Sequence, residues 1–293
     1  MSNNTNSTLL VTGASGNLGR IAVEELLARG ATRVIAGTRD PSKLQDLAAK
    51  GVEIRKLDFD EPATLTSALA GVERLLIVST DAVGRRVAQQ TAIIEAAKAA
   101  GVKHIVYTSA PAARPDADAG LGPEHFWTEV ALANSGLDFT VLRNHMYAEN
   151  TLADAGHVLA SGQIFGLIGD RGTSYVTRAD AARTAAGAIL TGEGKTIVDV
   201  TGPAPITNVE RAAVFAKASG KTINVIAITP PELHKGLVAA GIPDGFAGVL
   251  VAFQNDAVTG YHGVVTNVVE HFSGRKPTPY ADFIAANKAA LGL

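Results

Sequence analysis

Three glycines at fixed spacing follow a short apolar run near the start of the chain. Residues 8–12 are predicted to form a buried strand, and Gly13, Gly16 and Gly19 lead into residues with helical periodicity. In this strand–turn–helix setting the first glycine permits a tight turn. The second lets a pyrophosphate approach the backbone, and the third allows close helix–strand packing. The free amides at the helix N-terminus favour an anion. The pattern predicts a dinucleotide-binding loop, and a glycine-rich turn without a ligand is the alternative.

Strand and helix signals alternate through the first half of the chain. Such alternation is typical of a parallel sheet that is covered by helices on both faces. The predicted strands cover residues 8–12, 33–37, 52–57, 74–78, 104–108 and 139–143. The helices between them are expected to open at Leu18 and Asp40 and to cover residues 62–69, 85–100 and 124–135. The predicted fold class is therefore α/β, a doubly wound parallel sheet of the Rossmann type.

The regular alternation ends near residue 150. One further strand is predicted at residues 197–201, with helices at 208–219, 231–240 and 280–291. We therefore expect an NAD(P)-binding Rossmann domain over residues 8–150. Residues 151–293 are expected to form a smaller, partly helical C-terminal lobe that binds the substrate and shares an element or two with the sheet.

Charge and cysteine content exclude several kinds of partner. The chain has 26 Lys and Arg against 28 Asp and Glu, and no basic run is longer than Arg85–Arg86, so no nucleic acid is expected. It has no cysteine, which removes thiolate nucleophiles, iron–sulfur clusters and thiolate zinc sites and fits a reducing compartment. The seven histidines show no metal-ligand spacing. No metal site is expected.

Membrane and targeting signals are also missing. The first seven residues lack the basic and apolar parts of a signal peptide. Polar residues interrupt the apolar stretch at 245–269, so it does not read as a membrane span. We expect a cytoplasmic protein without membrane contact. Dimers are the most frequent oligomers, so a homodimer is an option.

The residues after the second predicted strand decide between two cofactors. An acid at this point would favour NAD, whereas Arg39 offers a planar cation for the 2′-phosphate of NADPH. Asp40 fits a helix cap better than a ribose ligand. NADPH is therefore expected and NAD stays an option; a solvated loop arginine is the alternative for Arg39.

Further cofactor contacts are expected from the loop and from the ends of other strands, where ligands bind in such sheets. Asp58 and Phe59 end the third strand, where adenine would lie, unless they are a turn acid and a core aromatic. The expected contacts are Gly13, Ser15, Gly16, Asn17, Leu18, Gly19, Arg39, Asp58, Phe59, Ser79, Thr80 and Thr108.

The chain lacks the Tyr and Lys, four residues apart, with which short-chain dehydrogenases protonate an alkoxide. The residues four positions after the five tyrosines are Pro111, Thr151, Ala179, Val265 and Ile284. On the helix where the pair is expected, His125 and Glu129 share one face. We take His125 as a candidate catalytic residue, and a surface pair is the alternative.

The missing pair constrains the chemistry. Reduction of a simple ketone gives a basic alkoxide that needs a strong proton donor. Reduction of a quinone gives a delocalised anion, and a triarylmethyl cation needs no proton at all. Hydride transfer to such acceptors depends mainly on positioning. The sequence therefore favours a conjugated small-molecule acceptor.

Several segments are similar to a known family. They are residues 13–19, 100–109, 125–129, 142–150, 177–180 and 240–244. Through them the chain resembles the NmrA-like, atypical short-chain dehydrogenases, and within these the type 2 NAD(P)H:quinone oxidoreductases, with the triphenylmethane reductases as near relatives. The resemblance implies a Rossmann domain, NADPH, and an acceptor cleft under the C-terminal lobe.

The resemblance also implies roles for the segment 142–150. Arg143, Asn144 and His145 would border the nicotinamide, Arg143 as a cofactor contact and the other two as catalytic candidates. Tyr147, a further catalytic candidate, and Asn150 would face the substrate. His145 and Met146 stand where smaller or aromatic residues are expected, which leaves the physiological acceptor open. An NADP-sensing regulatory protein and a ketone or imine reductase are the alternative functions.

Overall fold

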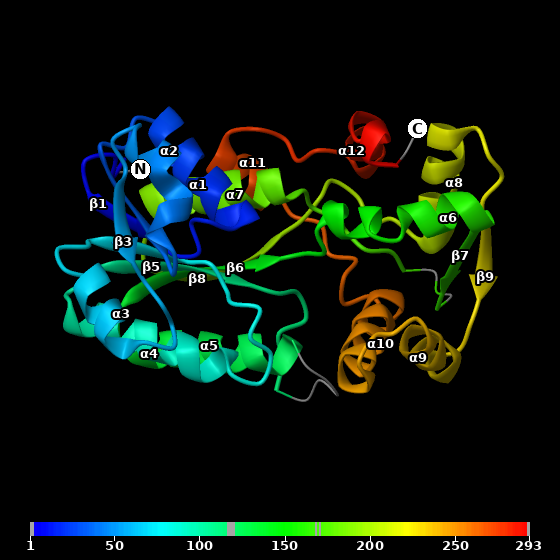
Figure 1. The fold of residues 1–293 in the computed structure, drawn as a ribbon, viewed down its shortest axis with the longest axis horizontal. Coiled ribbons are helices and arrows are strands. Elements are labelled where there is room, and N and C mark those ends of the chain that lie inside the picture. Colours follow the sequence, from blue (N-terminus) through cyan, green and yellow to red (C-terminus); the bar gives the residue numbers. More distant parts are fainter. Residues whose placement is uncertain (1–2, 116–120, 168, 170, 292–293) are drawn as a thin grey trace.

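A seven-stranded sheet forms the middle layer of the larger part of the molecule (Figure 1). The computed structural model describes residues 3–115, 121–167, 169 and 171–291. In spatial order the strands are β3 (Glu53–Lys56), β2 (Arg33–Thr38), β1 (Thr8–Val11), β4 (Arg74–Ile77), β5 (His104–Ser109), β6 (Asp138–Asn144) and β8 (Lys195–Val200). All neighbouring strands run parallel. The strand order reverses between β1 and β4, and the crevice outside their carboxyl ends is where ligands bind in such sheets.

Helices cover both faces of this sheet. One face carries α3 (Pro62–Ala68), α4 (Arg86–Ala99) and α5 (Leu121–Ser135). The other face carries α1 (Asn17–Ala28), η1 (Pro41–Leu44), α2 (Gln45–Ala48), α7 (Arg178–Thr191) and α11 (Val268–Ser273). The central strands are buried on both faces, and apolar residues fill their middle positions, as Leu9 and Leu10 of β1 do. The predicted doubly wound α/β fold is confirmed.

The helix α7 is a long element of the larger unit that the sequence did not predict. Thr177 caps its N-terminus, since the Thr177 hydroxyl accepts a hydrogen bond from the amide of Asp180. The helix packs against both α1 and α11. Its small residues permit this approach: a methyl group added at Gly187 would overlap the carbonyl group of Phe272 in α11. Gly187 therefore sets how closely the two helices lie.

The smaller lobe has its own core. A two-stranded parallel sheet, β7 (Gln163–Gly166) with β9 (Asn224–Ala227), lies beside several helices. The helical elements of the lobe are η2 (Ala148–Leu152), α6 (Ala155–Ser161), α8 (Asn208–Ser219), α9 (Pro230–Ala239), α10 (Asp244–Val258), α12 (Tyr280–Ala286) and η3 (Lys288–Leu291). Phe215, Tyr280 and Ile284 are buried at its centre. Thr207 and Thr229 begin α8 and α9 with reciprocal capping boxes, which fixes both helix starts.

The predicted element bounds agree to within a few residues, with clear exceptions. The single helix expected at residues 280–291 is wrong, because Asn287 separates α12 from η3. The elements α6, β7, β9, α10 and α11 were not predicted. The part of the chain after residue 150 supplies β8, α7 and α11 to the larger unit as well as most of the lobe. The division into residues 8–150 and 151–293 stays a proposal.

The length and the hydropathy of a helix decide whether it can cross a membrane. In the described part of the chain, no helix combines the length and the apolar character that a bilayer span requires.

Candidate functional site

A cleft of about 430 Å³ opens at the carboxyl ends of β1, β2, β3 and β4. This is the edge of the sheet at which the strand order reverses. Eight of the expected cofactor contacts line the cleft. They are Gly13, Ser15, Gly16, Arg39, Asp58, Phe59, Ser79 and Thr80. The structure therefore brings together residues that lie up to 67 positions apart in the sequence.

The glycine loop has the geometry that its spacing predicts. Gly13 has a positive φ of 59°, which favours glycine. A side chain at Gly19 would overlap the Gly13 carbonyl, so only glycine lets α1 pack so closely on the end of β1. Gly16 begins α1 without a side-chain cap, which leaves the first amides of the helix for an anion. The loop fits the pyrophosphate of a dinucleotide.

Three of the predicted loop contacts belong to the first turn of α1. They are Asn17, Leu18 and Gly19, of which Leu18 and Gly19 are buried in the packing of α1 on the sheet. Leu18 and Gly19 can therefore offer an anion only their backbone amides, which point to the N-terminal end of the helix. Thr108 lies deeper, at the end of β5, and its hydroxyl accepts a hydrogen bond from the amide of Ser79. It connects the ends of two neighbouring strands.

Arg39 is exposed at the rim of the cleft, just after β2. The neighbouring Asp40 caps η1, as predicted, because its carboxylate accepts hydrogen bonds from the amide and hydroxyl of Ser42. These bonds lower the pKa of Asp40. Asp60 is held by a hydrogen bond from Gln89 and an ion pair with Arg85, and both groups lower its pKa. The charge of Arg39 also lowers the pKa of Asp60, so Arg39 places a cation at this end of the cleft, directly after β2.

A buried polar group lies at the carboxyl ends of β5 and β6. The Glu129 carboxylate accepts a hydrogen bond of 2.6 Å from the Ser109 hydroxyl and two bonds, of 3.0 and 2.6 Å, from the guanidinium of Arg143. Glu129 is only 4% exposed. Arg143 is therefore oriented by Glu129 at the edge where a nicotinamide is expected. The alternative that His125 and Glu129 form a surface pair is wrong.

His125 points to a different partner. Its Nδ1 lies 2.6 Å from the hydroxyl of Tyr107, a residue of β5, and the imidazole is 4% exposed. Burial, helped by the positive charge of Arg86, lowers the pKa of His125 to about 3. The ring is neutral at physiological pH. Its proposed catalytic role would have to be that of a neutral hydrogen-bonding group.

The buried His125 predicts a loss of stability in acid. In the unfolded chain His125 takes up a proton near pH 6.5, whereas in the folded chain it does so only near pH 3. The free energy of unfolding therefore falls as the pH drops through this window. His125 alone is expected to lower the free energy of unfolding by about 2 kcal/mol between pH 7 and pH 5. Urea unfolding at both pH values would measure it. His125→Gln should lose less stability over the same interval; an equal loss would contradict the assignment.

The remaining catalytic candidates follow β6. The Asn144 side-chain amide donates a hydrogen bond of 3.0 Å to the hydroxyl of Tyr147. Burial raises the pKa of Tyr147 to about 12, which makes it a poor acid. The ring nitrogens of His145 face two acceptors, the carbonyl of His262 and the carboxylate of Asp199, each at 3.2 Å. These three residues are neighbours, whereas His125 lies on α5.

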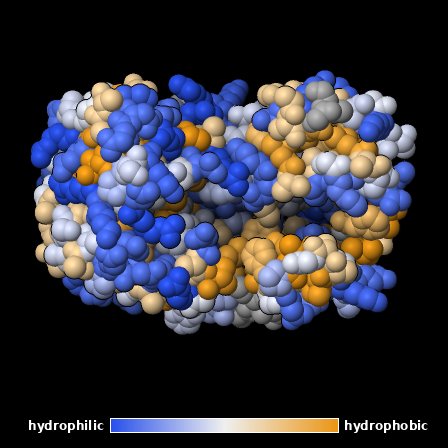
Figure 2. Space-filling view, viewed as in Figure 1, coloured by the Kyte–Doolittle hydropathy of each residue, from blue (hydrophilic) through white to orange (hydrophobic). Residues whose placement is uncertain are grey.

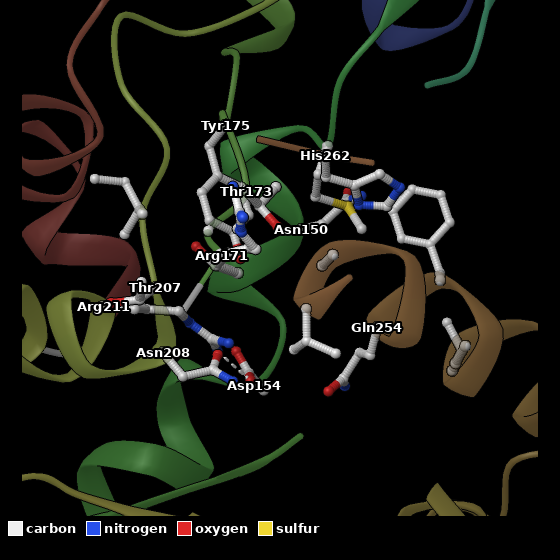
Figure 3. A pocket seen from close by; sticks show the side chains of 18 of the residues that line it. Asn150, Asp154, Arg171, Thr173, Tyr175, Thr207, Asn208, Arg211, Gln254 and His262 are labelled. Atoms are coloured by element: carbon white, nitrogen blue, oxygen red, sulfur yellow. Dashed lines mark hydrogen bonds and ion pairs between the residues drawn. The ribbon is translucent and has the colours of Figure 1, made fainter. Parts of the chain in front are cut away.

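A second cavity, of about 650 Å³, lies between the segment after β6 and helices α8 and α10. Figure 2 shows a hollow between the two parts of the molecule, with hydrophobic residues below it where Figure 1 places α9 and α10. Asp154, Asn208 and Arg211 gather at one end of the cavity, and His262 lies apart from them (Figure 3). Phe253 of α10 contributes to its apolar wall.

Sequence reasoning found only the near edge of this cavity. Met146 and Asn150 come from the segment 142–150, and Asn150 holds the guanidinium of Arg178 through its side-chain oxygen. Asn208 and Arg211 come from α8, which was predicted as a helix but not as part of a site. Most of the other lining residues come from α10, which was not predicted, or from loops. A single sequence carries no signal that would place His262 beside residues of α10, because that neighbourhood arises only from the tertiary fold.

The comparisons with known proteins agree with this geometry. The model of a family described as NAD(P)H-binding matches residues 13–191. Quinone oxidoreductase 2 of Escherichia coli is 41% identical over 245 residues, which cover 83% of this chain and 85% of that protein. The NAD(P)H azoreductase of Xenophilus azovorans is 30% identical and covers 97% of this chain and 99% of its own.

Solved structures give the same picture. The structure of the NADPH-dependent quinone oxidoreductase of Escherichia coli, complexed with NADPH, superposes with a TM-score of 0.90 at 36% identity. The alignment covers 95% of this chain and 99% of that one. Triphenylmethane reductase of Citrobacter sp., complexed with NADP(H), gives a TM-score of 0.86 at 29% identity, with coverage of 95% and 99%.

Proposed function

The chain belongs to the NAD(P)H-binding family, and on this premise we propose that it is an NADPH-dependent reductase of quinones and similar conjugated acceptors. The observation that carries the proposal is the cleft at the reversal of strand order, where the glycine loop and Arg39 face the same space. The uncapped start of α1 suits the pyrophosphate, and Arg39 suits the 2′-phosphate. The bound cofactor supplies the hydride; the chain orients it and excludes water.

The acceptor class follows from what the relatives reduce and from the acids that this chain offers. The names of the relatives specify a quinone, an azo compound and a triphenylmethane dye as substrates, all of which are conjugated. Tyr147, with its raised pKa, is a poor proton donor. A delocalised product needs no strong acid, so this site suits such acceptors better than simple ketones. We assign the acceptor to the cavity of about 650 Å³ beside Met146 and Asn150.

Steady-state oxidation of NADPH with a panel of quinones tests the reductase. The expected result is acceptor-dependent oxidation well above background. If NADPH binds but no acceptor accelerates its oxidation, the reductase proposal is wrong and the chain is a cofactor-binding protein.

Arg39→Ala tests the cofactor preference. We expect the Kd for NADPH to rise because a charge-assisted phosphate contact is worth about 1.5–3 kcal/mol. Such a loss corresponds to a roughly 10- to 150-fold weaker Kd. The Kd for NADH should change little, since NADH has no 2′-phosphate. Titration of both cofactors by fluorescence gives the two values.

The matched control is Arg33→Ala. Arg33 is also exposed and lies on β2, at the end opposite to the cleft. It should leave both Kd values unchanged. Equal weakening of NADPH and NADH in the Arg39 variant would show that Arg39 does not hold the 2′-phosphate.

We also propose a compartment, an oligomeric state and partners for this reductase. The lack of cysteine agrees with a reducing compartment such as the cytoplasm. A homodimer stays an option. Neither a nucleic acid nor a resident metal is part of the proposal, and NADPH and a small conjugated molecule are its only partners.

A further inference from the structure

His262 is a buried histidine whose ring nitrogens have no hydrogen-bond partner among the described residues. The residue is only 1% exposed, yet it lines the cavity of about 650 Å³. Its own carbonyl accepts hydrogen bonds from the amide of Ser174 and from Nδ1 of His145, so the backbone is fixed. Buried polar groups are normally paired, and an unpaired one calls for an explanation. A ligand in the cavity would supply it.

The contacts of His262 hold the ring at the wall of the cavity. The ring of Phe253, another lining residue, lies 4.4 Å away between centroids, and the ring of His145 lies 6.3 Å away. Figure 3 shows His262 apart from the charged group of Asp154 and Arg211. The unpaired imidazole of His262 at this end of the cavity is therefore separate from the ion pair of Arg211 with Asp154 at the other end.

The imidazole of His262 is neutral in this setting. Burial lowers the pKa of His262 to about 4, with further lowering by the charges of His145 and Arg114 and an opposing contribution from Asp256. A neutral imidazole offers one N–H donor and one lone pair. A neutral histidine of this kind can polarise a carbonyl without giving up its proton.

We propose that His262 is the hydrogen-bond donor for the acceptor: its ring N–H binds an oxygen conjugated with a planar, uncharged acceptor ring that packs against Phe253. The inference rests on the proposed reductase function and names a contact of the acceptor site. In the proposed step the acceptor gains a hydride and NADPH is oxidised to NADP⁺. The negative charge that develops on the acceptor oxygen is stabilised by the N–H bond, and this oxygen then takes a proton from water. His262 is unchanged.

Two variants of His262 test the contact. His262→Phe keeps a ring of similar size but removes the donor, and His262→Gln keeps an N–H. With 1,4-naphthoquinone, His262→Phe is expected to lower kcat/KM about 10-fold or more, because donors aimed at developing charge carry large effects. His262→Gln should retain most of the activity. The Kd for NADPH should be unchanged in both variants.

A second acceptor separates this role from a structural one. Malachite green is a cation that carries no oxygen, so His262→Phe should leave its reduction at the wild-type rate. The melting temperature of His262→Phe should equal or exceed that of the wild type, since two unpaired buried atoms are removed. The matched control is His271→Phe, an exposed histidine on α11 that should change nothing.

The results that would overturn the inference are distinct from failure of the proposed function. If His262→Phe reduces the quinone as fast as the wild type does, the contact does not exist. If it slows both acceptors equally and melts earlier, His262 is a structural residue. If the wild-type chain binds NADPH but none of the acceptors accelerates its oxidation, the reductase function itself is wrong, and the inference with it.

Discussion

Gly187→Ala is expected to lower the free energy of unfolding by about 3 kcal/mol or more. The added methyl group would overlap the backbone carbonyl of Phe272, and a backbone carbonyl cannot move aside as a flexible side chain can. Accommodation requires α7 and α11 to move apart, which opens the buried core between α1, α7 and the sheet. Urea unfolding, followed by circular dichroism, would measure the loss.

Gly236→Ala is the matched control. Gly236 lies inside α9 and is exposed, and nothing lies within 4 Å of the position that a methyl group would take. Alanine should therefore stabilise this variant by about 0.5–1 kcal/mol through its helix propensity. If Gly187→Ala also raised the stability, the close packing of α7 on α11 would be wrong.

Glu129→Ala is the second change with a large expected effect. Removal of the Glu129 carboxylate leaves the guanidinium of Arg143 and the hydroxyl of Ser109 without their common partner. Breaking a buried ion pair from one side costs about 3–5 kcal/mol, and the 25% exposure of the Arg143 side chain reduces this to roughly 2–4 kcal/mol. Reductase activity should fall as well, because Arg143 loses its orientation at the cofactor edge.

The control for Glu129 is Glu24→Ala. Glu24 forms an exposed pair with Arg20, at 3.6 Å, so its loss should cost less than about 0.5 kcal/mol. Glu129→Gln separates charge from shape, since glutamine fills the same space and still accepts hydrogen bonds. A loss for Glu129→Ala no greater than that for Glu24→Ala would show that the buried group contributes little.

Local signals predicted the layered half of the fold. Most of the first six strands are short, largely apolar runs that end near a glycine or a polar turn, whereas β3 carries Glu53, Arg55 and Lys56. The bounds of β6 were predicted to within one residue at each end. The cleft residues could also be predicted, because a parallel sheet brings the carboxyl ends of its strands to one edge. The resemblance to quinone oxidoreductases is confirmed by the relatives, which align along most of the chain.

The missed elements lack the signals on which such reasoning depends. The helix α7 is buried on nearly all sides, so its alanines show no polar face and no amphipathic period. The helix α10 is similarly rich in apolar residues, and its phenylalanines face a cavity instead of a core. The pairing of Glu129 with Arg143 joins α5 to β6, and sequence spacing alone cannot show that these two side chains meet.

The order in which the elements follow one another bears on how the chain is made. The larger unit is complete only when α7 and α11 have docked, and α11 ends at residue 273. During synthesis the first six strands leave the ribosome before α7 and α11, so the part of the α1 face that these two helices cover is still open to water. A nascent chain stopped near residue 150 would therefore present a broad apolar surface, and chaperone binding at that stage is the natural consequence. Complete packing of the larger unit therefore requires the chain up to residue 273.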